Sequence, residues 1–238
     1  MAIVGKYVKF HDCYLSLIEA VKHAGAALSA KIDFHWVDAE SLSEDNIEDK
    51  LSSSDALIVP GGFGDRGVEG MILAAEYCRN KKIPYLGICL GMQVAVIEFA
   101  RNVANLTDAH SREFNPNTPY PVIDFLPDQR EGIDMGGTLR LGSYPCELKE
   151  GTKIRDCYGE PLIKERHRHR YEFSNEYRET LEKAGLVLSG SSPDGRIIET
   201  VETTNPFYVG VQFHPEFKSR PTKPHPLFLG LLKAAIDS

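Results

Sequence analysis

The sequence lacks both an excess of positive charge and a long hydrophobic run. Its 27 Lys and Arg residues stand against 34 Asp and Glu, which gives a net charge of -7 and argues against electrostatic binding of nucleic acid or an anionic membrane. The longest stretch without a charged side chain, residues 83–97, has 15 residues, fewer than the roughly 18 that a membrane span needs. We therefore expect neither a nucleic-acid nor a membrane partner.

Paired cysteines and targeting signals are also missing. The five cysteines include no Cys-x-x-Cys pair, and an odd set of this kind fits reduced thiols, one of which is free to be catalytic. The first residues show no basic segment followed by an apolar run and a small-residue cleavage site, so they do not resemble a secretory signal. The sequence predicts a cytoplasmic protein.

What the sequence does contain is a regular alternation of strand-length apolar runs and helix-length amphipathic segments. Within the first hundred residues the pattern predicts strands at 2–4, 32–37, 56–60 and 83–88, and helices at 14–24, 44–51, 68–80 and 90–99. This order predicts an α/β fold with a doubly wound, mostly parallel sheet flanked by helices.

A different texture interrupts this alternation between residues 119 and 170, where Gly- and Pro-rich turns separate short strands. The α/β pattern then resumes with a helix at 175–184, strands at 186–189, 197–201 and 208–213, and a helix at 227–236. No internal repeat and no low-complexity linker divides the chain. We expect a single domain over residues 1–238 with a β-rich insertion.

The sharpest local pattern is Gly87-Ile-Cys-Leu-Gly91, where a predicted buried strand turns into a helix. It has the form of a nucleophile elbow, in which the central residue takes a strained conformation and the flanking glycines avoid collisions in the tight turn. Cysteine there lies at a helix N-terminus, where the dipole favours the thiolate. The alternative is that Cys89 is a small buried apolar residue; the elbow pattern favours a nucleophile.

A nucleophilic thiolate needs a base, a group that orients the base, and donors for the oxyanion. His214-Pro-Glu216 follows the predicted strand at 208–213 and leaves the sheet at the same edge as the elbow. His214 is therefore the candidate base and Glu216 its partner. Taken alone, the tripeptide favours a loop histidine beside an exposed carboxylate.

Residues 60–67 form a glycine-rich loop after another predicted strand. Its backbone amides can approach a ligand closely, and one of them can donate a hydrogen bond to an oxyanion. A phosphate-binding loop is an alternative, but the Lys-Ser or Lys-Thr that completes that motif is absent. A plain tight turn is the third interpretation.

The segment from Glu165 to Glu172 alternates arginine with histidine. If it is extended, its period of two places His167 and His169 on one face and three arginines on the other. Two histidines could begin a metal site, but no further ligands at suitable spacing complete it, so we predict no metal. The arginines could instead hold a carboxylate through bidentate bonds.

Together these patterns resemble the class I, or triad, glutamine amidotransferases. The resemblance rests on three motifs in order, Pro60-Gly-Gly-Phe-Gly64, Gly87-Ile-Cys-Leu-Gly-Met-Gln93 and Gln212-Phe-His-Pro-Glu216. Three further stretches are similar to the glutaminase domains of CTP synthases, namely Ser111-Arg-Glu-Phe114, Met135 to Gly142 and Glu165 to Tyr171. The resemblance covers essentially the whole chain.

The resemblance implies hydrolysis of the side-chain amide of L-glutamine. Cys89 would form a γ-glutamyl thioester, and His214, held by Glu216, would protonate the departing ammonia and then activate water. The backbone amides of Gly62 and Leu90 would form the oxyanion hole. The implied glutamine-binding residues are Gly62, Leu90, Gln93, Glu113, Arg170 and Tyr171, with Glu113 at the α-ammonium and the segment Arg170–Tyr171 at the α-carboxylate.

The resemblance also implies partners beyond this chain. Members of the family carry a synthetase domain that uses ATP and magnesium to aminate UTP to CTP, and nothing similar to it precedes Ile3. The chain therefore resembles an excised or naturally free glutaminase domain, with no cofactor of its own. GTP activates glutamine hydrolysis in the family, and the loops holding Phe63, Arg66 and Arg140 resemble the region that senses it.

Two alternatives differ in the acceptor or in the class of function. A glutaminase domain could serve another ammonia acceptor, but the stretches at 135–142 and 166–171 speak against that. A non-catalytic domain could keep the fold and sense glutamine for regulation. The joint presence of Cys89, His214 and Glu216 disfavours the second alternative, because a binding domain needs no nucleophile with its base.

Overall fold

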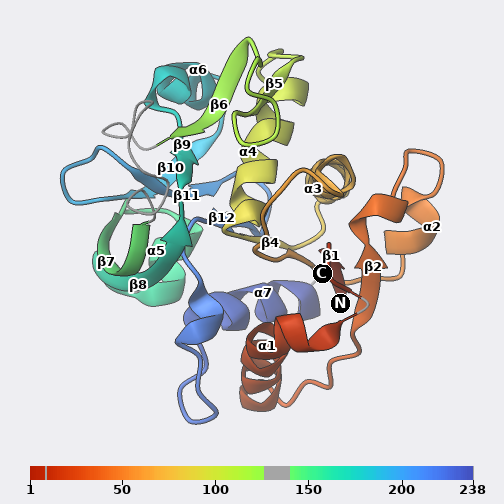
Figure 1. Cartoon of the computed structure of the whole chain (residues 1–238). Coiled ribbons are helices and arrows are strands. Elements are labelled where there is room, and N and C mark those ends of the chain that lie inside the picture. The colour runs from red at the N-terminus through yellow and green to blue at the C-terminus, as the bar shows by residue number, and fades with distance from the viewer. Residues whose placement is uncertain (9, 126–139, 238) are drawn as a thin grey trace.

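The architecture is seen in a computed structural model of the chain, which describes residues 1–8, 10–125 and 140–237 (Figure 1). Within this part, one sheet of nine strands has the order β2-β1-β3-β4-β12-β11-β10-β7-β8, and a sheet of three has the order β5-β6-β9. The strands of the large sheet are β1 (Ala2–Gly5), β2 (His35–Asp38), β3 (Leu57–Val59), β4 (Tyr85–Ile88), β7 (Arg140–Leu148), β8 (Leu162–His169), β10 (Val187–Ser191), β11 (Ile198–Glu202) and β12 (Tyr208–Val211). The small sheet consists of β5 (Ala109–Ser111), β6 (Tyr120–Phe125) and β9 (Tyr171–Phe173).

The predicted doubly wound α/β architecture is confirmed, and its sheet is mixed. The strands from β2 to β12 in the sheet order pair in parallel, whereas β12, β11, β10, β7 and β8 pair antiparallel. The connections from β10 to β11 and from β11 to β12 are only a few residues long. A parallel crossover needs a dozen residues or more, so these strands must turn back on their neighbours.

The β-rich segment that the sequence predicts at 119–170 extends the large sheet. Strands β7 and β8 form a long hairpin whose β7 pairs with β10, while β6 pairs with β9 of the small sheet. The short strand β5 was not predicted from the sequence. Residues 135–139 of one family stretch lie outside the described residues.

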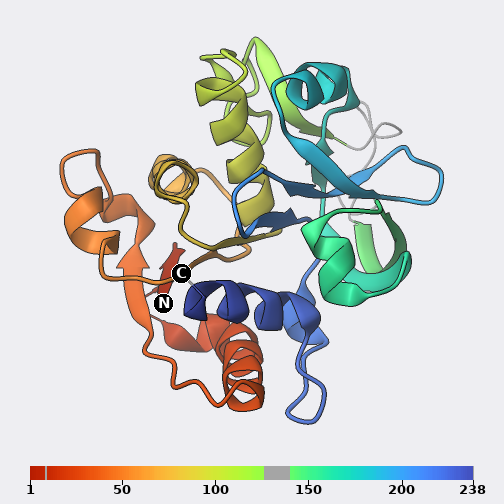
Figure 2. The same ribbon diagram turned by 180° about the vertical axis from the view of Figure 1, so that it is seen from behind.

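Helices cover both faces of the large sheet (Figures 1 and 2). They are α1 (Leu15–Ala27), α2 (Ile47–Leu51), α3 (Val68–Lys81), α4 (Leu90–Asn102), α5 (Lys153–Tyr158), α6 (Arg178–Lys183) and α7 (Pro226–Ile236), with short 3-10 turns η1 (His11–Tyr14), η2 (Ala39–Ser41), η3 (Asn175–Tyr177) and η4 (Pro215–Phe217). Among the described residues, no helix combines the length and hydropathy needed to cross a membrane.

Alternation along the strands divides the core into two layers. Ile3, Ile58 and Leu86 are buried in the cluster that contains α1 and α7, while Val4 and Tyr85 are buried in the cluster that contains α3 and α4. Successive side chains of a strand point to opposite faces of the sheet, so a strand covered on both faces is apolar throughout. This explains the continuous apolar runs in the sequence.

The central strands bring three distant segments to one edge of the sheet. Strands β3, β4 and β12 lie side by side and parallel, with Val59 opposite Gly87 and Ile88 opposite Val211. The segments that follow them therefore leave the sheet together at its carboxyl edge, which is where open α/β sheets bind ligands. These segments are 60–67, 89–93 and 212–216, and they carry the predicted nucleophile and its partners.

Candidate active site

The turn from β4 to α4 holds Cys89 in a conformation that few non-glycine residues adopt. Its φ is 53° and its ψ is -102°. A Cβ on Gly87 would lie 2.5 Å from the carbonyl oxygen of Gly91, and a Cβ on Gly91 would lie 2.1 Å from that of Val59. Both glycines are therefore required by close backbone approach. The predicted elbow is confirmed, with Cys89 at the N-cap of α4.

Cys89 is buried, and the side chain of Gln212 donates a hydrogen bond to its sulfur. Its side chain belongs to a residue that is 6% exposed, and its backbone N–H donates to the carbonyl of Val211 over 2.7 Å. The Nε2 of Gln212 donates to its Sγ over 3.6 Å. A Cβ on Gly61 would lie 2.8 Å from Cε1 of His214 and 3.5 Å from Cβ of Cys89, and Cys89 raises the pKa of His214, so the nucleophile and the predicted base are neighbours.

His214 is held between Cys89 and Glu216. Its Nδ1 lies 2.8 Å from Oε1 of Glu216, and its backbone N–H donates to the carbonyl of Arg166 on β8 over 2.8 Å. Burial acts to lower the pKa of His214, but the hydrogen bonds and charges of Cys89 and Glu216 outweigh it and raise the pKa to about 10. An imidazolium facing a cysteine stabilises its thiolate. The structure thus brings the three predicted residues together.

The glycine-rich loop passes directly against this pair. A Cβ on Gly61 would lie 2.8 Å from Cε1 of His214, and one on Gly62 would lie 3.2 Å from Cδ2 of Leu90. Leu90 is the first residue of α4, so its amide N–H has no acceptor within the helix. Gly62 and Leu90 therefore lie side by side next to Cys89, and the oxyanion hole formed by their amides stays a prediction.

Lys6 holds the glycine-rich loop at 60–67 in place, a role that the sequence did not predict. Its Nζ donates to the carbonyls of Phe63, over 3.1 Å, and Gly64, while Oε1 of Glu113 accepts a bond from the Gly64 N–H over 3.0 Å. Burial lowers the pKa of Lys6 to about 8, against the raising effect of the charge on Glu113. The available signal was its position, because Lys6 directly follows β1 at the same edge of the sheet.

The predicted glutamine contacts gather on one side of Cys89. Nε2 of Gln93 donates to the Tyr171 carbonyl over 3.1 Å and to Oε1 of Gln212 over 3.2 Å. Burial raises the pKa of the Tyr171 phenol, and the charges of Glu113 and Arg170 also act on it, which places both near that ring. Arg170 is exposed at the bend between β8 and β9, so it is open to an anionic group.

Phe63 and Arg66 share a loop, whereas Arg140 lies elsewhere. Phe63 is 75% exposed, and Arg66 donates to the Lys6 carbonyl and to Glu40 over 2.7 and 2.8 Å. Arg140 is buried, with Nη2 2.6 Å from Oε1 of Glu199. The structure therefore does not place Arg140 with the other two as one exposed surface, because its guanidinium is needed to balance a buried carboxylate.

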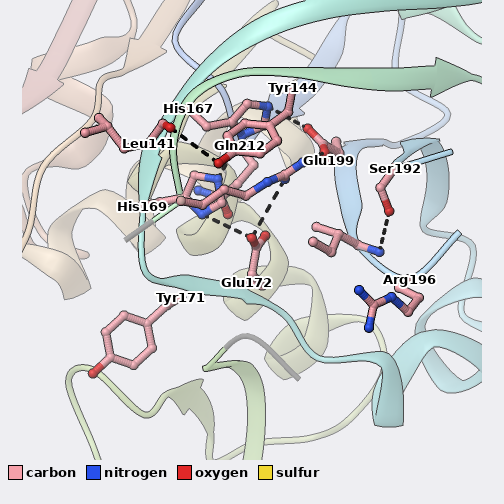
Figure 3. Close-up of polar contacts among 12 residues, drawn as sticks. Leu141, Tyr144, His167, His169, Tyr171, Glu172, Ser192, Arg196, Glu199 and Gln212 are labelled. Carbon is pink, nitrogen blue, oxygen red and sulfur yellow. Dashed lines mark hydrogen bonds and ion pairs between the residues drawn. The ribbon is translucent and has the colours of Figure 1, made fainter. Parts of the chain in front are cut away.

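The alternating segment on β8 behaves as its period predicts, with His167 and His169 buried and the arginines exposed. Nδ1 of His167 lies 2.8 Å from Nε2 of His169, and its Nε2 lies 2.8 Å from Oε2 of Glu199. Nδ1 of His169 lies 3.3 Å from Oε1 of Glu172. Figure 3 shows Glu172 pointing into this charge network, formed by Arg140, His167, His169, Glu172 and Glu199, while the adjacent Tyr171 points away from it.

A surface hollow of about 390 Å³ lies at the opposite end of the sheet. Its lining includes Met1, Phe34, Ser54 and Leu232, which precede or flank the amino ends of the strands. It contains none of the groups described above. The chemistry of the carboxyl edge, rather than the size of a cavity, identifies the candidate site.

Comparisons with known proteins agree with this geometry. Residues 9–234 match the family described as glutamine amidotransferase class-I. A CTP synthase of Shouchella clausii is 58% identical over 99% of this chain and 44% of its own length, so the chain spans less than half of that relative. The CTPS glutaminase domain of Trypanosoma brucei, solved with bound acivicin, is 38% identical with a TM-score of 0.91, covering 100% of this chain and 93% of that one. A glutamine amidotransferase from Thermotoga maritima, 15% identical over 99% of this chain and 96% of its own, has a TM-score of 0.55 and shares the fold.

Proposed function

The chain belongs to the class-I glutamine amidotransferase family, among the glutaminase domains of CTP synthases, and we propose on this basis that it hydrolyses L-glutamine to glutamate and ammonia. The observation that carries the proposal is the contact of Cys89 with His214 at a nucleophile elbow, with Glu216 2.8 Å behind the imidazole. A regulatory domain has no use for a buried imidazolium facing a cysteine.

In the first half-reaction, the Cys89 thiolate attacks the side-chain amide carbon of glutamine. The carbonyl oxygen becomes an oxyanion, which the amides of Gly62 and Leu90 would stabilise. His214 then gives its proton to the amide nitrogen, the C–N bond breaks, and ammonia leaves a γ-glutamyl thioester. The raised pKa of His214, about 10, means that this proton is present at neutral pH.

In the second half-reaction, the now neutral His214 takes a proton from water as the water attacks the thioester carbon. The C–S bond breaks, glutamate leaves, and the thiolate–imidazolium pair is restored. Glu216 keeps the same imidazole nitrogen hydrogen-bonded in both steps, so that the other nitrogen faces the reacting atoms.

The substrate's α-amino acid end would be recognised by charged side chains of the predicted glutamine-binding set. The Glu113 carboxylate suits the α-ammonium, and the exposed Arg170 guanidinium suits the α-carboxylate. Both N–H groups of the Gln93 amide are engaged within the protein, so only its carbonyl oxygen can face a ligand. Gln93 would therefore accept a bond from the substrate.

The destination of the ammonia is a further proposal. The relatives are named CTP synthase, which supports delivery to a synthetase domain that uses ATP and magnesium to aminate UTP. GTP would act as an activator at the loop carrying Phe63 and Arg66, where an exposed ring and a guanidinium suit a base and phosphates. Arg140 is not part of this proposal, because its side chain is buried.

Covalent labelling with acivicin tests the proposed hydrolytic site directly. Intact-mass spectrometry should show one adduct on the wild-type chain, excess glutamine should prevent it, and Cys89→Ala should abolish it. Cys13→Ala, which removes an exposed cysteine, is the matched control and should label normally. No adduct on a folded chain, or an adduct that survives Cys89→Ala, contradicts the proposal.

A further inference from the structure

Gln212 is a buried amide that lies between the glutamine-binding side of the site and the nucleophile. It is 0% exposed and directly follows β12. Its Oε1 accepts from Gln93 over 3.2 Å, and its Nε2 donates to Sγ of Cys89 over 3.6 Å. None of the roles assigned above uses this side chain.

The direction of these hydrogen bonds is set by the backbone carbonyl of Tyr171, which contacts Gln93. A backbone carbonyl can only accept, so the group of Gln93 that lies 3.1 Å from the Tyr171 carbonyl must be its NH₂. The second N–H of the same group points to Gln212, which must therefore present its carbonyl oxygen to Gln93. The NH₂ of Gln212 is then left to face the sulfur of Cys89, as a donor.

Backbone bonds hold both amides in place. The N–H of Gln212 donates to the carbonyl of Glu199 over 2.8 Å, and the N–H of Gln93 donates to the carbonyl of Cys89 over 3.3 Å. Because the backbones of both residues are fixed by the sheet and by the first turn of α4, the two side-chain amides stay in register. Rotation of the Gln212 amide would turn its NH₂ against the NH₂ of Gln93 and its carbonyl oxygen toward the sulfur, leaving both sides mismatched. The donor to sulfur is therefore preorganised.

We propose that Gln212 is a catalytic residue whose amide N–H stabilises the Cys89 sulfur as a thiolate. A thiolate is a far better acceptor than a thiol or a thioester sulfur, so the bond is strongest before attack and again when the sulfur leaves the thioester. The donor would thus assist the second half-reaction, in which the C–S bond breaks. This inference rests on the proposed function of Cys89.

The titratable groups around the sulfur are few. His214 faces Cys89 and is backed by Glu216. His167 and His169 are close enough to His214 for its charge to lower their pKa. All of these remain in place when Gln212 is replaced, so a change in the pH dependence of Cys89 reactivity reports the lost amide.

The test is the rate of Cys89 alkylation by iodoacetamide between pH 4 and 10 in the 238-residue chain, with peptide mapping to identify the modified cysteine. Gln212→Leu should reach its half-maximal rate about one pH unit higher, as expected when a hydrogen bond to a charged group is lost. On the acid side of the profile, where the rate depends on the ionised fraction of the sulfur, this variant should therefore react about tenfold more slowly. Thr200→Val is the matched control. It removes a buried hydrogen bond to Ser189 on the neighbouring strands and should leave the profile unchanged.

An unchanged profile in folded Gln212→Leu overturns the inference. If that variant does not fold, the side-chain amide protons of Gln212 in the ¹⁵N-labelled wild-type chain decide the matter. They should shift with pH over the range in which alkylation accelerates, and a flat titration overturns the inference. Acivicin labelling separates the two proposals, because normal labelling of Cys89 with an unchanged alkylation profile rejects only the role of Gln212.

Discussion

Two groups of buried histidines in this molecule carry opposite pKa shifts. His214 has its pKa raised to about 10 because Cys89 and Glu216 outweigh the effect of burial. For His167 and His169, burial lowers the pKa, and the nearby charge of Arg140 adds to the effect. Burial acts in the same direction on all three. The difference shows that the partners of each imidazole decide its charge.

The number of protons that their ring nitrogens can share explains how His167 and His169 stay neutral. If the Nε2 of His167 carries the proton that faces Glu199, its Nδ1 must accept from Nε2 of His169. Nδ1 of His169 lies 3.3 Å from Oε1 of Glu172 and can accept a hydrogen bond from that carboxyl when it is protonated. Burial raises the pKa of Glu172 well above its ordinary value, which fits this arrangement. Arg140 and Glu199 then form the close charged pair of the network, at 2.6 Å, while Oε1 of Glu172 lies 3.9 Å from Nη1 of Arg140.

Replacing Cys89 should reduce the difference in pKa between His214 and the other two histidines more than any other change. In Cys89→Ala, His214 loses the largest of the contributions that raise its pKa, so that pKa should fall and His214 should come to resemble His167. Glutamine hydrolysis should fall at least about a thousandfold. The ammonia release rate and a histidine NMR titration check these two outcomes. An unchanged titration of His214 would show that Cys89 does not set its charge.

Removing Glu199, the carboxylate nearest to Arg140, should have the next largest effect. Glu199→Gln leaves the buried Arg140 guanidinium without its carboxylate at 2.6 Å. Loss of one partner from a buried ion pair costs about 3–5 kcal/mol of unfolding free energy. Urea unfolding measures this loss. A change below about 1 kcal/mol would mean that the pair behaves as an exposed one.

Adding a methyl group beside His214 should displace its imidazole without changing any charge in the site. In Gly61→Ala, the new Cβ would lie 2.8 Å from Cε1 of His214, so the imidazole must shift. Displacement of a catalytic group by about 1 Å costs on the order of a hundredfold in rate. Gly230→Ala, whose Cβ would meet Cys157 at 2.6 Å, is the control; it should lower stability and leave kcat unchanged.

The two groups should also affect stability in different pH ranges. The raised pKa of His214 contributes stability that is complete below about pH 6.5, the ordinary value, and is lost as pH rises through about 10. The lowered pKa values of His167 and His169 favour the unfolded chain as pH falls below about 6.5. Replacing His214 with Ala should therefore abolish the loss of stability on the alkaline side. On the acid side it should have only a small effect, because the charge of His214 is the smallest of the causes given for the lowered pKa values of His167 and His169. Urea unfolding across pH measures both limbs.

The smallest effect on stability is expected at Glu172, where His169 needs a hydrogen-bond donor and not a charged partner. In Glu172→Gln, the amide N–H can replace the carboxylic O–H that faces Nδ1 of His169. The unfolding free energy should change by less than about 1 kcal/mol, in contrast to Glu199→Gln. A loss as large as that of Glu199→Gln would show that Glu172 is ionised.

The parallel half of the sheet and the elbow could be predicted because their causes are local. Apolar runs give the strands, and the two glycines around Cys89 mark the turn that the backbone requires. The antiparallel half was also within reach, because the predicted strands at 186–189, 197–201 and 208–213 are too close in sequence for parallel crossovers. The connection lengths carried the information.

Side-chain partners from distant strands could not be predicted. Alternation on β8 indicates that His167 and His169 share a buried face, but Glu199 reaches them from β11. Gln212 begins one of the three motifs and Lys6 directly follows β1, but only the assembled edge of the sheet shows that Gln212 touches the sulfur and Lys6 the loop. The buried ion pair of Arg140 was missed for the same reason, since it depends on tertiary contacts.

The most direct test of the account is a single pH titration of the ¹³C-labelled histidines by NMR, with His214 assigned through His214→Ala. The account predicts that His214 titrates near pH 10 while His167 and His169 titrate below the ordinary value of about 6.5. A His214 resonance that titrates at or below that value would contradict the thiolate–imidazolium pair and, with it, the proposed chemistry of Cys89.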